Sequence, residues 1–363
     1  MEPDFYHGFY PPTPLKTYPE EIFYIGKCTE NMQPVGLDIG TNYTKITADG
    51  KNVLLYPSIV AYGEEKDWSL KGETKSVYIG DEALSIVQSM ENVEVLRPLH
   101  EGRVLHTSYL ELAKYGLNKL KVKDGLIATG LPVKSSKKER EELKRELESE
   151  LNSKVLIFPE PVGTMAYMGM ETGVCVDIGF GTTDVLVIAD MEYLKGDTML
   201  MGVDKLYENL EVAVRNRIGI SITPEEMTKL LTTEGYEIGR IRGGKKVSVS
   251  REEIMPEYEG YVKTWVERIA SRVKLVLEGL STTLVENFAI TGGGSMLPGV
   301  YEMFKESFSD IGDVKRPDEP IKANSIGYYI LAKSLVVEAE TEQSGDAEIL
   351  DADDKKKGRK GKK

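Results

Sequence analysis

Two stretches of the chain repeat one pattern: an apolar strand that ends in Asp, a small turn that begins with Gly, and a second strand. They are Val35–Ile46 and Val174–Val185. The strands between and after them alternate with helical stretches, which is typical of an α/β protein. The repeat therefore predicts two similar halves, with one acidic hairpin in each.

The residue types in both turns suit a polyphosphate ligand. Glycine lets backbone N–H groups approach phosphate oxygens, hydroxyl and amide side chains add neutral donors, and lysine adds a positive charge. The candidate phosphate-binding residues are Gly40, Thr41, Asn42, Tyr43, Thr44, Lys45, Gly179, Phe180, Gly181, Thr182 and Thr183. We expect Asp38 and Asp177 to face a magnesium ion through water, because Mg²⁺ keeps most of its waters and needs carboxylates nearby.

A third glycine-rich turn follows a helix and the apolar strand at Phe288. Three consecutive glycines destabilise any regular element, so they indicate close approach of the backbone to a nucleoside or an α-phosphate. A single Asp-x-Gly turn would be ordinary loop chemistry. Two acidic hairpins and this turn, spread over about 260 residues, favour a nucleotide site. The third turn adds Gly292, Gly293, Gly294 and Ser295 to the candidates.

In this order the three segments resemble the phosphate-1, phosphate-2 and adenosine motifs of one superfamily. It joins actin, the bacterial plasmid-segregation and cell-shape actins, the seventy-kilodalton heat-shock chaperones and sugar kinases. The resemblance covers about residues 34–337 and implies an actin-like (ribonuclease H-like) α/β fold, with duplicated domains around a nucleotide cleft. It also implies ATP/ADP and Mg²⁺ as cofactors.

Three further segments resemble the ParM-like and archaeal actin-like ATPases: Ala128–Pro132, Pro159–Thr164 and Ala323–Gly327, of which the last two are similar to connecting segments. One position departs from the family pattern. Asn42 stands where a second glycine is common, so we expect a less close backbone approach at the first turn.

The resemblance aligns Glu160 with the position that orients or polarises the attacking water. The candidate catalytic residues are therefore Glu160, Asp38 and Asp177. A carboxylate between the two hairpins could accept a proton from water or orient the water in line with the γ-phosphate. The alternative is a glutamate that only caps a helix or faces solvent beside two prolines.

Periodicity and turn signals predict the local elements. Helices are expected to begin with capping boxes at Ser136 and Thr223. An Asp49–Gly50 turn should join the second and third strands. Three strands and one long amphipathic helix are expected at Val35–Ile39, Tyr43–Ala48, Val53–Tyr56 and Val262–Leu280.

We expect a first domain at 34–171 with a return at 320–337, and a second at 172–319. Small insertions near 57–95 and 205–260 should form outer subdomains.

Other apparent motifs have simpler interpretations. Gly239–Lys246 nearly matches a P-loop, but Lys246 replaces the Ser or Thr that binds Mg²⁺ and the next residues alternate, which predicts a basic β-hairpin. His7, His100 and His106 have no metal-ligand spacing. No Ser–His–Asp arrangement is supported either.

The formal net charge of −13 argues against a surface that binds nucleic acid throughout. Of the two cysteines, Cys175 lies in an apolar run and is expected to be a buried thiol, and a disulfide framework is excluded. No signal peptide or spanning helix is recognisable, so the expected location is cytoplasmic.

The two chain ends differ from the middle. Residues 1–33 form an extension rich in Tyr, Phe and Pro, interpreted as an arm on its own domain, a disordered segment, or a docking segment for a neighbouring subunit. Residues 338–363 form a tail, predicted to be disordered, that is acidic and then basic. Its basic end could contact DNA or an anionic membrane, or simply be solvated.

By resemblance, the first functional hypothesis is a filament-forming ATPase with a cytoskeletal or DNA-segregation role, and with an adaptor protein as a possible partner. The alternatives are a chaperone-type nucleotide switch, a sugar or acid kinase, and a non-hydrolysing anchor of the same fold. Against the switch, the chain ends about 26 residues after the last predicted helix, without a substrate-binding domain. The cargo and the choice between ATP and GTP stay open.

Overall fold

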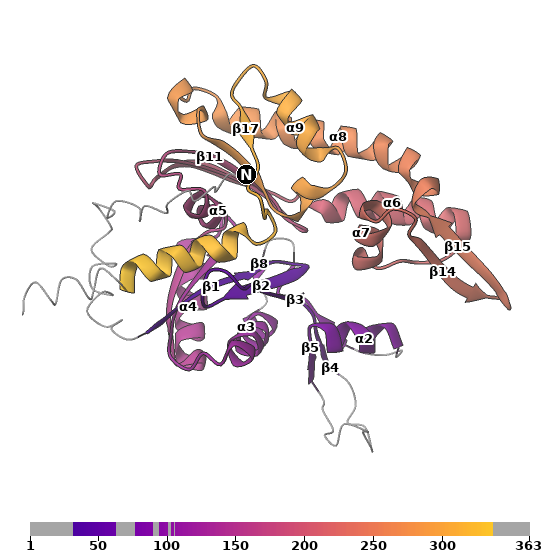
Figure 1. The fold of residues 1–363 in the computed structure, drawn as a ribbon, viewed down its shortest axis with the longest axis horizontal. Helices are drawn as coiled ribbons and strands as arrows, with labels where there is room; N and C mark the ends of the chain where they lie inside the picture. Colours follow the sequence, from indigo (N-terminus) through magenta and orange to yellow (C-terminus); the bar gives the residue numbers. More distant parts are fainter. Residues whose placement is uncertain (1–31, 63–76, 90–93, 101–102, 105, 337–363) are drawn as a thin grey trace, which may run out of the picture.

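The computed structural model describes residues 32–62, 77–89, 94–100, 103–104 and 106–336. Two five-stranded sheets form the centre of the molecule, one in each half (Figure 1). The N-terminal extension, with His7 and Cys28, and the acidic-then-basic tail lie outside the described residues.

The two sheets have the same topology. In each, three antiparallel strands are followed by two strands parallel to the first. The first sheet contains β1 (Gln33–Ile39), β2 (Tyr43–Thr47), β3 (Leu54–Pro57), β9 (Gly125–Leu131) and β10 (Lys154–Pro159) in the order β3-β2-β1-β9-β10. The second contains β11 (Gly173–Ile178), β12 (Thr183–Ala189), β13 (Glu192–Met199), β16 (Phe288–Thr291) and β17 (Val314–Lys315) in the order β13-β12-β11-β16-β17. The repeat predicted from the hairpins is therefore a repeat of the whole sheet.

Helices cover the outer face of each sheet. Successive strand residues point to opposite faces, so every second residue of a strand can pack against these helices. In β1, Val35, Leu37 and Ile39 pack with residues of α3 (His106–Leu120) and α4 (Lys137–Leu151). The second sheet packs with α6 (Val203–Ile218), α7 (Pro224–Thr232), α8 (Arg251–Leu277) and α9 (Val300–Ser307).

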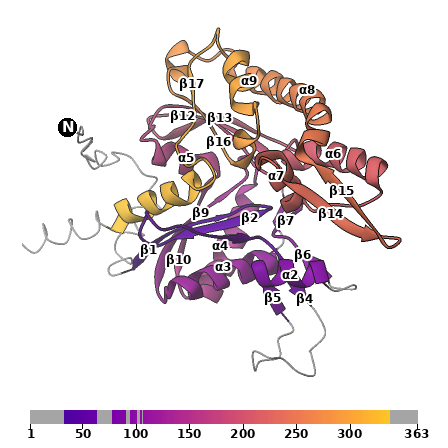
Figure 2. The same cartoon turned by 45° about the vertical axis from the view of Figure 1, so that its right-hand side comes forward.

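Two helices lie between the sheets: α5 (Pro161–Tyr167) and the helix over residues 323–336, yellow in Figures 1 and 2. They share one apolar cluster with strands of both sheets, including Ala128 of β9 and the fully buried Cys175 of β11. Their backbones touch, since a Cβ on Gly163 would lie 2.6 Å from Asn324 O and a Cβ on Gly327 would overlap the Gly163 carbonyl. These glycines allow the two connecting helices to cross closely.

Smaller elements extend from each half (Figure 1). The first half carries α2 (Asp81–Ser89), β4 (Val60–Tyr62), β5 (Val77–Ile79), β6 (Glu94–Leu96), β7 (Leu99–His100) and β8 (Arg103–Val104). The second carries α7 and the hairpin of β14 (Glu237–Arg242) and β15 (Lys245–Ser250). We propose that domain boundaries near residues 171 and 320 separate the two sheets with these attached parts.

Most local predictions are confirmed. Ser136 and Thr223 form capping boxes, and Gly50 has a φ of 70° in the turn before β3. The near-P-loop is the predicted hairpin β14–β15. The long helix starts earlier than predicted, at Arg251, because Ser250 forms a third capping box.

Two short 3₁₀ helices, η1 (Thr282–Val285) and η2 (Gly293–Met296), flank β16. Among the helices in the described part of the chain, none has the length and apolar character needed to cross a membrane.

Candidate nucleotide-binding cleft

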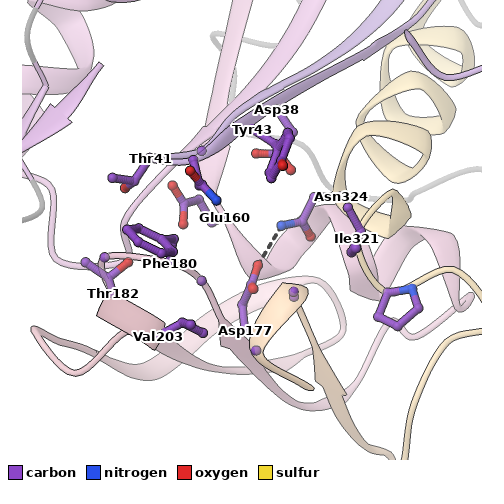
Figure 3. A pocket seen from close by; sticks show the side chains of 18 of the residues that line it. Asp38, Thr41, Tyr43, Glu160, Asp177, Phe180, Thr182, Val203, Ile321 and Asn324 are labelled. Carbon is purple, nitrogen blue, oxygen red and sulfur yellow. Dashed lines mark hydrogen bonds between the residues drawn. The ribbon is translucent and has the colours of Figure 1, made fainter. Parts of the chain in front are cut away.

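One pocket lies where β1, β11 and β16 end, between the two halves (Figure 3). Every predicted site residue lines it except Thr44, Thr183 and Ser295. Three segments far apart in the sequence therefore converge on a single cleft.

The two hairpins place their acidic residues at equivalent positions. In the β1–β2 register Asp38 lies opposite Lys45, and in the β11–β12 register Asp177 lies opposite Asp184. Both turns close by the same backbone hydrogen bond: Gly40 N donates to Tyr43 O at 3.2 Å, and Gly179 N donates to Thr182 O at 2.9 Å.

The turns also contact each other across the cleft. A Cβ on Gly181 would lie 3.0 Å from Thr41 Oγ1, which is tighter than normal packing. Glycine at 181 therefore lets the turns at Gly40–Tyr43 and Gly179–Thr182 approach each other. We call them the first and second phosphate turns, because a phosphate lying between them would meet backbone from both halves.

The acidic pair suits a divalent cation. Asp38 and Asp177 are 7% and 6% exposed, and Lys45 Nζ donates to Asp38 Oδ2 at 3.0 Å. Burial, and then the charge of Asp38, raise the pKa of Asp177 to about 7, while the hydrogen bond from Asn324 opposes that shift. A cation would relieve this repulsion. No group of three or more His, Cys, Asp or Glu side chains that could hold a metal ion occurs in the described residues.

Asn324 was not among the predicted site residues, yet it organises the base of the cleft. Its Nδ2 donates to Asp177 Oδ2 at 2.6 Å, the dashed line in Figure 3. Its Oδ1 accepts from Thr164 N at 3.0 Å and from Thr164 Oγ1 at 2.7 Å. Thr164 Oγ1 also lies 3.1 Å from Thr291 Oγ1. This network joins β11, β16 and both connecting helices.

Glu160 occupies the N-cap position of α5, but its side chain makes no capping hydrogen bond. Its backbone is fixed: Glu160 N donates to Leu131 O at 2.9 Å, and Tyr328 Oη donates to Glu160 O at 2.8 Å. The carboxylate lines the cleft. Burial first, and then Asp184, Asp177 and Asp38, raise its pKa well above the ordinary range, which favours a group that accepts a proton.

Asp184 is a further buried acid, and sequence reasoning missed it. Its Oδ1 accepts from Val133 N at 2.7 Å and from Thr198 Oγ1 at 2.5 Å, and its Oδ2 accepts from Thr182 Oγ1 at 3.0 Å. Burial raises its pKa to about 6. Asp184 thus fixes the second phosphate turn to the chain segment that follows β9.

The surroundings of the three consecutive glycines differ, as shown by what a Cβ atom would meet at each position. A Cβ on Gly292 would overlap Asp177 Oδ1, and a Cβ on Gly294 would overlap Ile178 Cγ2, so both pack against the end of β11. A Cβ on Gly293 would meet nothing within 4 Å. Packing therefore explains Gly292 and Gly294, whereas Gly293 borders open space in the cleft.

Three predicted hydroxyl side chains are already engaged in hydrogen bonds away from the cleft. Thr44 Oγ1 lies 2.8 Å from Ser58 Oγ, Thr183 Oγ1 donates to Met201 O, and Ser295 Oγ donates to Gly292 O. All three residues are fully buried.

The remaining lining residues form a largely apolar wall on the second half. Tyr207 Oη and Thr228 Oγ1 lie 2.9 Å apart there. Sequence reasoning missed this wall because apolar residues at helical spacing also indicate ordinary core. The wall consists of Val203, Tyr207, Thr228, Leu297, Pro320 and Ile321.

Comparison with known proteins identifies the family. The family model described as MreB/Mbl protein matches residues 32–338. This chain belongs to the MreB/Mbl family. The cell shape-determining protein Mbl of Bacillus subtilis is 28% identical over 329 residues, covering 83% of this chain and 96% of that protein.

Solved structures of similar fold include MreB and MamK proteins. MreB5 of Spiroplasma citri, bound to AMPPNP, superposes with a TM-score of 0.68 at 20% identity, covering 86% of this MreB/Mbl chain and 99% of that one. The structure described as the MamK double helical filament superposes with a TM-score of 0.68 at 19% identity, covering 82% of this chain and 98% of that one. The predicted actin-like fold is confirmed. The archaeal actin homologue Ta0583 superposes with a TM-score of 0.64 at 23% identity, covering 83% of this chain and 99% of that one. The resemblance to ParM-like proteins is not specifically supported by the Mbl, MreB and MamK relatives.

Proposed function

We propose that this MreB/Mbl-family chain binds ATP with Mg²⁺ between its two acidic hairpins, hydrolyses it, and assembles into cytoskeletal filaments. The observation that carries the proposal is the convergence of Asp38, Asp177 and the triple-glycine turn on one cleft. The binding of AMPPNP by the structural neighbour MreB5 supports it.

The cleft offers separate surfaces for the two ends of the nucleotide. Backbone N–H groups of the turns at Gly40 and Gly179 suit the phosphates. The open backbone at Gly293 and the wall containing Val203 and Leu297 suit a flat base and ribose. Asp38 and Asp177 would hold Mg²⁺ through its waters, and the ion would neutralise charge on the phosphates.

For hydrolysis we assign the water-activating role to Glu160. Its carboxylate would orient a water in line with the γ-phosphorus and accept the proton as the new P–O bond forms. The bond from the γ-phosphorus to the bridging oxygen breaks, which leaves ADP and phosphate. The Glu160 side chain makes no capping hydrogen bond to α5 and its carboxylate lines the cleft, which favours this role over a capping role.

Assembly is inferred from the family. The MamK neighbour was solved as a double helical filament, and head-to-tail contacts between identical subunits generate open filaments. Contacts of the basic tail with DNA or an anionic membrane, an adaptor protein, and a DNA-segregation role remain predictions, since the tail lies outside the described residues.

Sedimentation tests the function. The purified chain is incubated with Mg²⁺ and ATP, ADP or no nucleotide, centrifuged at high speed, and assayed for released phosphate. We expect ATP to increase the pelleted fraction, and chelation of Mg²⁺ to abolish both pelleting and phosphate release. Phosphate transfer to a sugar, without pelleting, would instead identify a kinase, and ATP binding without either would identify a switch or anchor.

A further inference from the structure

The Arg97 guanidinium contacts two parts of the molecule that are far apart in the sequence. It lies between β6 and β7 in the outer part of the first half. Its Nη1 donates to Thr41 O at 3.3 Å and to Asn42 Oδ1 at 3.1 Å, both in the first phosphate turn. Its Nη2 donates to Glu225 Oε1 at 3.4 Å, in the first turn of α7 on the second half. One guanidinium therefore bridges the cleft and holds a phosphate turn.

Glu225 depends on this contact. It is 5% exposed, and its second oxygen, Oε2, is buried without a hydrogen-bond partner in the described part of the chain. A buried carboxylate is unfavourable unless it is paired. The N-terminus of α7 provides partial positive charge, but the ion pair within the described residues is with Arg97. Separation of the two halves would hydrate Glu225 and break the pair.

Asn42 provides the side-chain acceptor for Arg97 in the first phosphate turn. It is the position at which a second glycine is common among proteins that this chain resembles, and glycine has no side-chain oxygen to offer a guanidinium. Here Asn42 is 7% exposed, its carbonyl accepts from Ser58 N at 2.9 Å, and its Oδ1 accepts from Arg97. The departure from the family pattern thus coincides with the contact to Arg97.

The base of Arg97 is also fixed, because Ser108 Oγ donates to Arg97 O at 3.0 Å. Movement of Glu225 would therefore displace mainly the guanidinium of Arg97, and this would change its hydrogen bonds to Thr41 and Asn42. These two residues line the cleft, although Arg97 does not.

We propose that Arg97 is a positioning residue that couples closure of the two halves, through Glu225, to the shape of the first phosphate turn. The proposal rests on the proposed nucleotide function of the cleft. It predicts that ATP binding and closure favour each other, since Arg97 has all of its partners only when the halves are closed.

The experiment combines a closure sensor with substitutions. Donor and acceptor dyes are placed on Ser85→Cys in α2 and Lys245→Cys in the β14–β15 hairpin, on opposite halves (Figure 1), in a Cys28→Ser background. Energy transfer is measured with and without Mg²⁺ and ATP, together with the dissociation constant, KM and kcat. Thermal unfolding and circular dichroism verify that each variant is folded.

Arg97→Met should reduce the ATP-dependent change in energy transfer by at least about half and raise the ATP dissociation constant about fivefold or more. Glu225→Gln should act in the same direction. Adding Glu225→Gln to Arg97→Met should change the dissociation constant by less than about twofold, because the shared interaction is already lost. Arg97→Lys should recover closure more than affinity, since an ammonium is a point charge that cannot span both sites.

Charge reversal separates the two contacts of Arg97. The Arg97→Glu/Glu225→Arg pair should restore closure relative to Arg97→Glu alone, but not affinity, because a carboxylate would face Thr41 O and Asn42 Oδ1. Arg272→Met removes an ion pair with Asp197 outside the cleft and should match the wild type. Normal closure and affinity in folded Arg97→Met, or independent effects of Arg97 and Glu225, would overturn the coupling. Absence of ATP binding by the wild type would instead refute the proposed function.

Discussion

Asn324 Nδ2 donates to Asp177 Oδ2 at 2.6 Å, and this contact joins the start of the second connecting helix to the second acidic hairpin. The same amide accepts two hydrogen bonds from Thr164 on the first connecting helix. The carboxylate assigned to Mg²⁺ is therefore oriented by the helices that run between the two sheets.

Asn324→Ala should weaken binding of Mg²⁺-ATP about tenfold or more, because a hydrogen bond to a charged group is lost and Thr164 loses its acceptor. Titration calorimetry measures the change. Asn209→Ala is the matched control, since within the described residues its exposed side chain donates to Lys205 O of its own helix. Equal affinities for the two variants would contradict the role of Asn324.

Asp177→Asn should stabilise the nucleotide-free protein at pH 8 while weakening binding of Mg²⁺-ATP. The pKa of Asp177 is raised to about 7 in the folded chain. The folded state therefore binds an extra proton between about pH 4 and 7, and the stability contributed by this group falls as pH rises through that window. The neutral amide removes the penalty of the buried charge at pH 8.

The melting temperature checks this prediction. The pKa shift corresponds to a free-energy change of at most about 4 kcal/mol, and each kcal/mol raises Tm by roughly 1–2 °C in a chain of this length. The gain should be present at pH 8 and nearly absent at pH 5, where the wild-type carboxyl is protonated. A variant less stable than the wild type at pH 8 would show that Asp177 is not strained without a ligand.

Glu160→Ala should leave ATP binding largely intact and slow phosphate release at least about tenfold, because it removes the group that orients the water. Stopped-assay phosphate release and equilibrium binding give the two quantities. Glu171→Ala, on the loop before β11, is a suitable acidic control. Unchanged turnover in Glu160→Ala would remove the assignment.

Gly293→Ala and Gly294→Ala form a matched pair. A methyl group at Gly294 would overlap Ile178, so Gly294→Ala should destabilise the fold by about 1–3 kcal/mol. A methyl group at Gly293 meets no protein atom, so this variant should fold normally but bind nucleotide more weakly. Chemical denaturation and nucleotide titration distinguish the two variants. A Gly293→Ala protein with reduced stability and normal nucleotide affinity would contradict the proposed ligand contact at Gly293.

Local chemistry in the sequence predicted much of the site. Asp38 and Asp177 are each the penultimate residue of a buried strand, two positions before a glycine, so their positions follow from a pattern of about ten residues. Capping at Thr223 and the turn at Gly50 are likewise local, and they were predictable for the same reason.

Contacts between distant segments were not predictable in this way. Asn324 lies 147 positions from Asp177, and Arg97 lies 128 positions from Glu225. Neither residue has a local pattern that names its partner. The packing of Gly292 and Gly294 against the end of β11 was not predictable either, because a glycine required by packing and a glycine required by a ligand are identical in sequence.

The central claim is that one metal-bound triphosphate lies between the two acidic hairpins. A crystal structure grown with AMPPNP and Mn²⁺ in place of Mg²⁺ tests it most directly, through the anomalous signal of the metal. We predict one strong anomalous peak between Asp38 and Asp177, next to phosphates that contact the turns at Gly40 and Gly179. Ordered nucleotide elsewhere, or a metal distant from both carboxylates, would contradict the account.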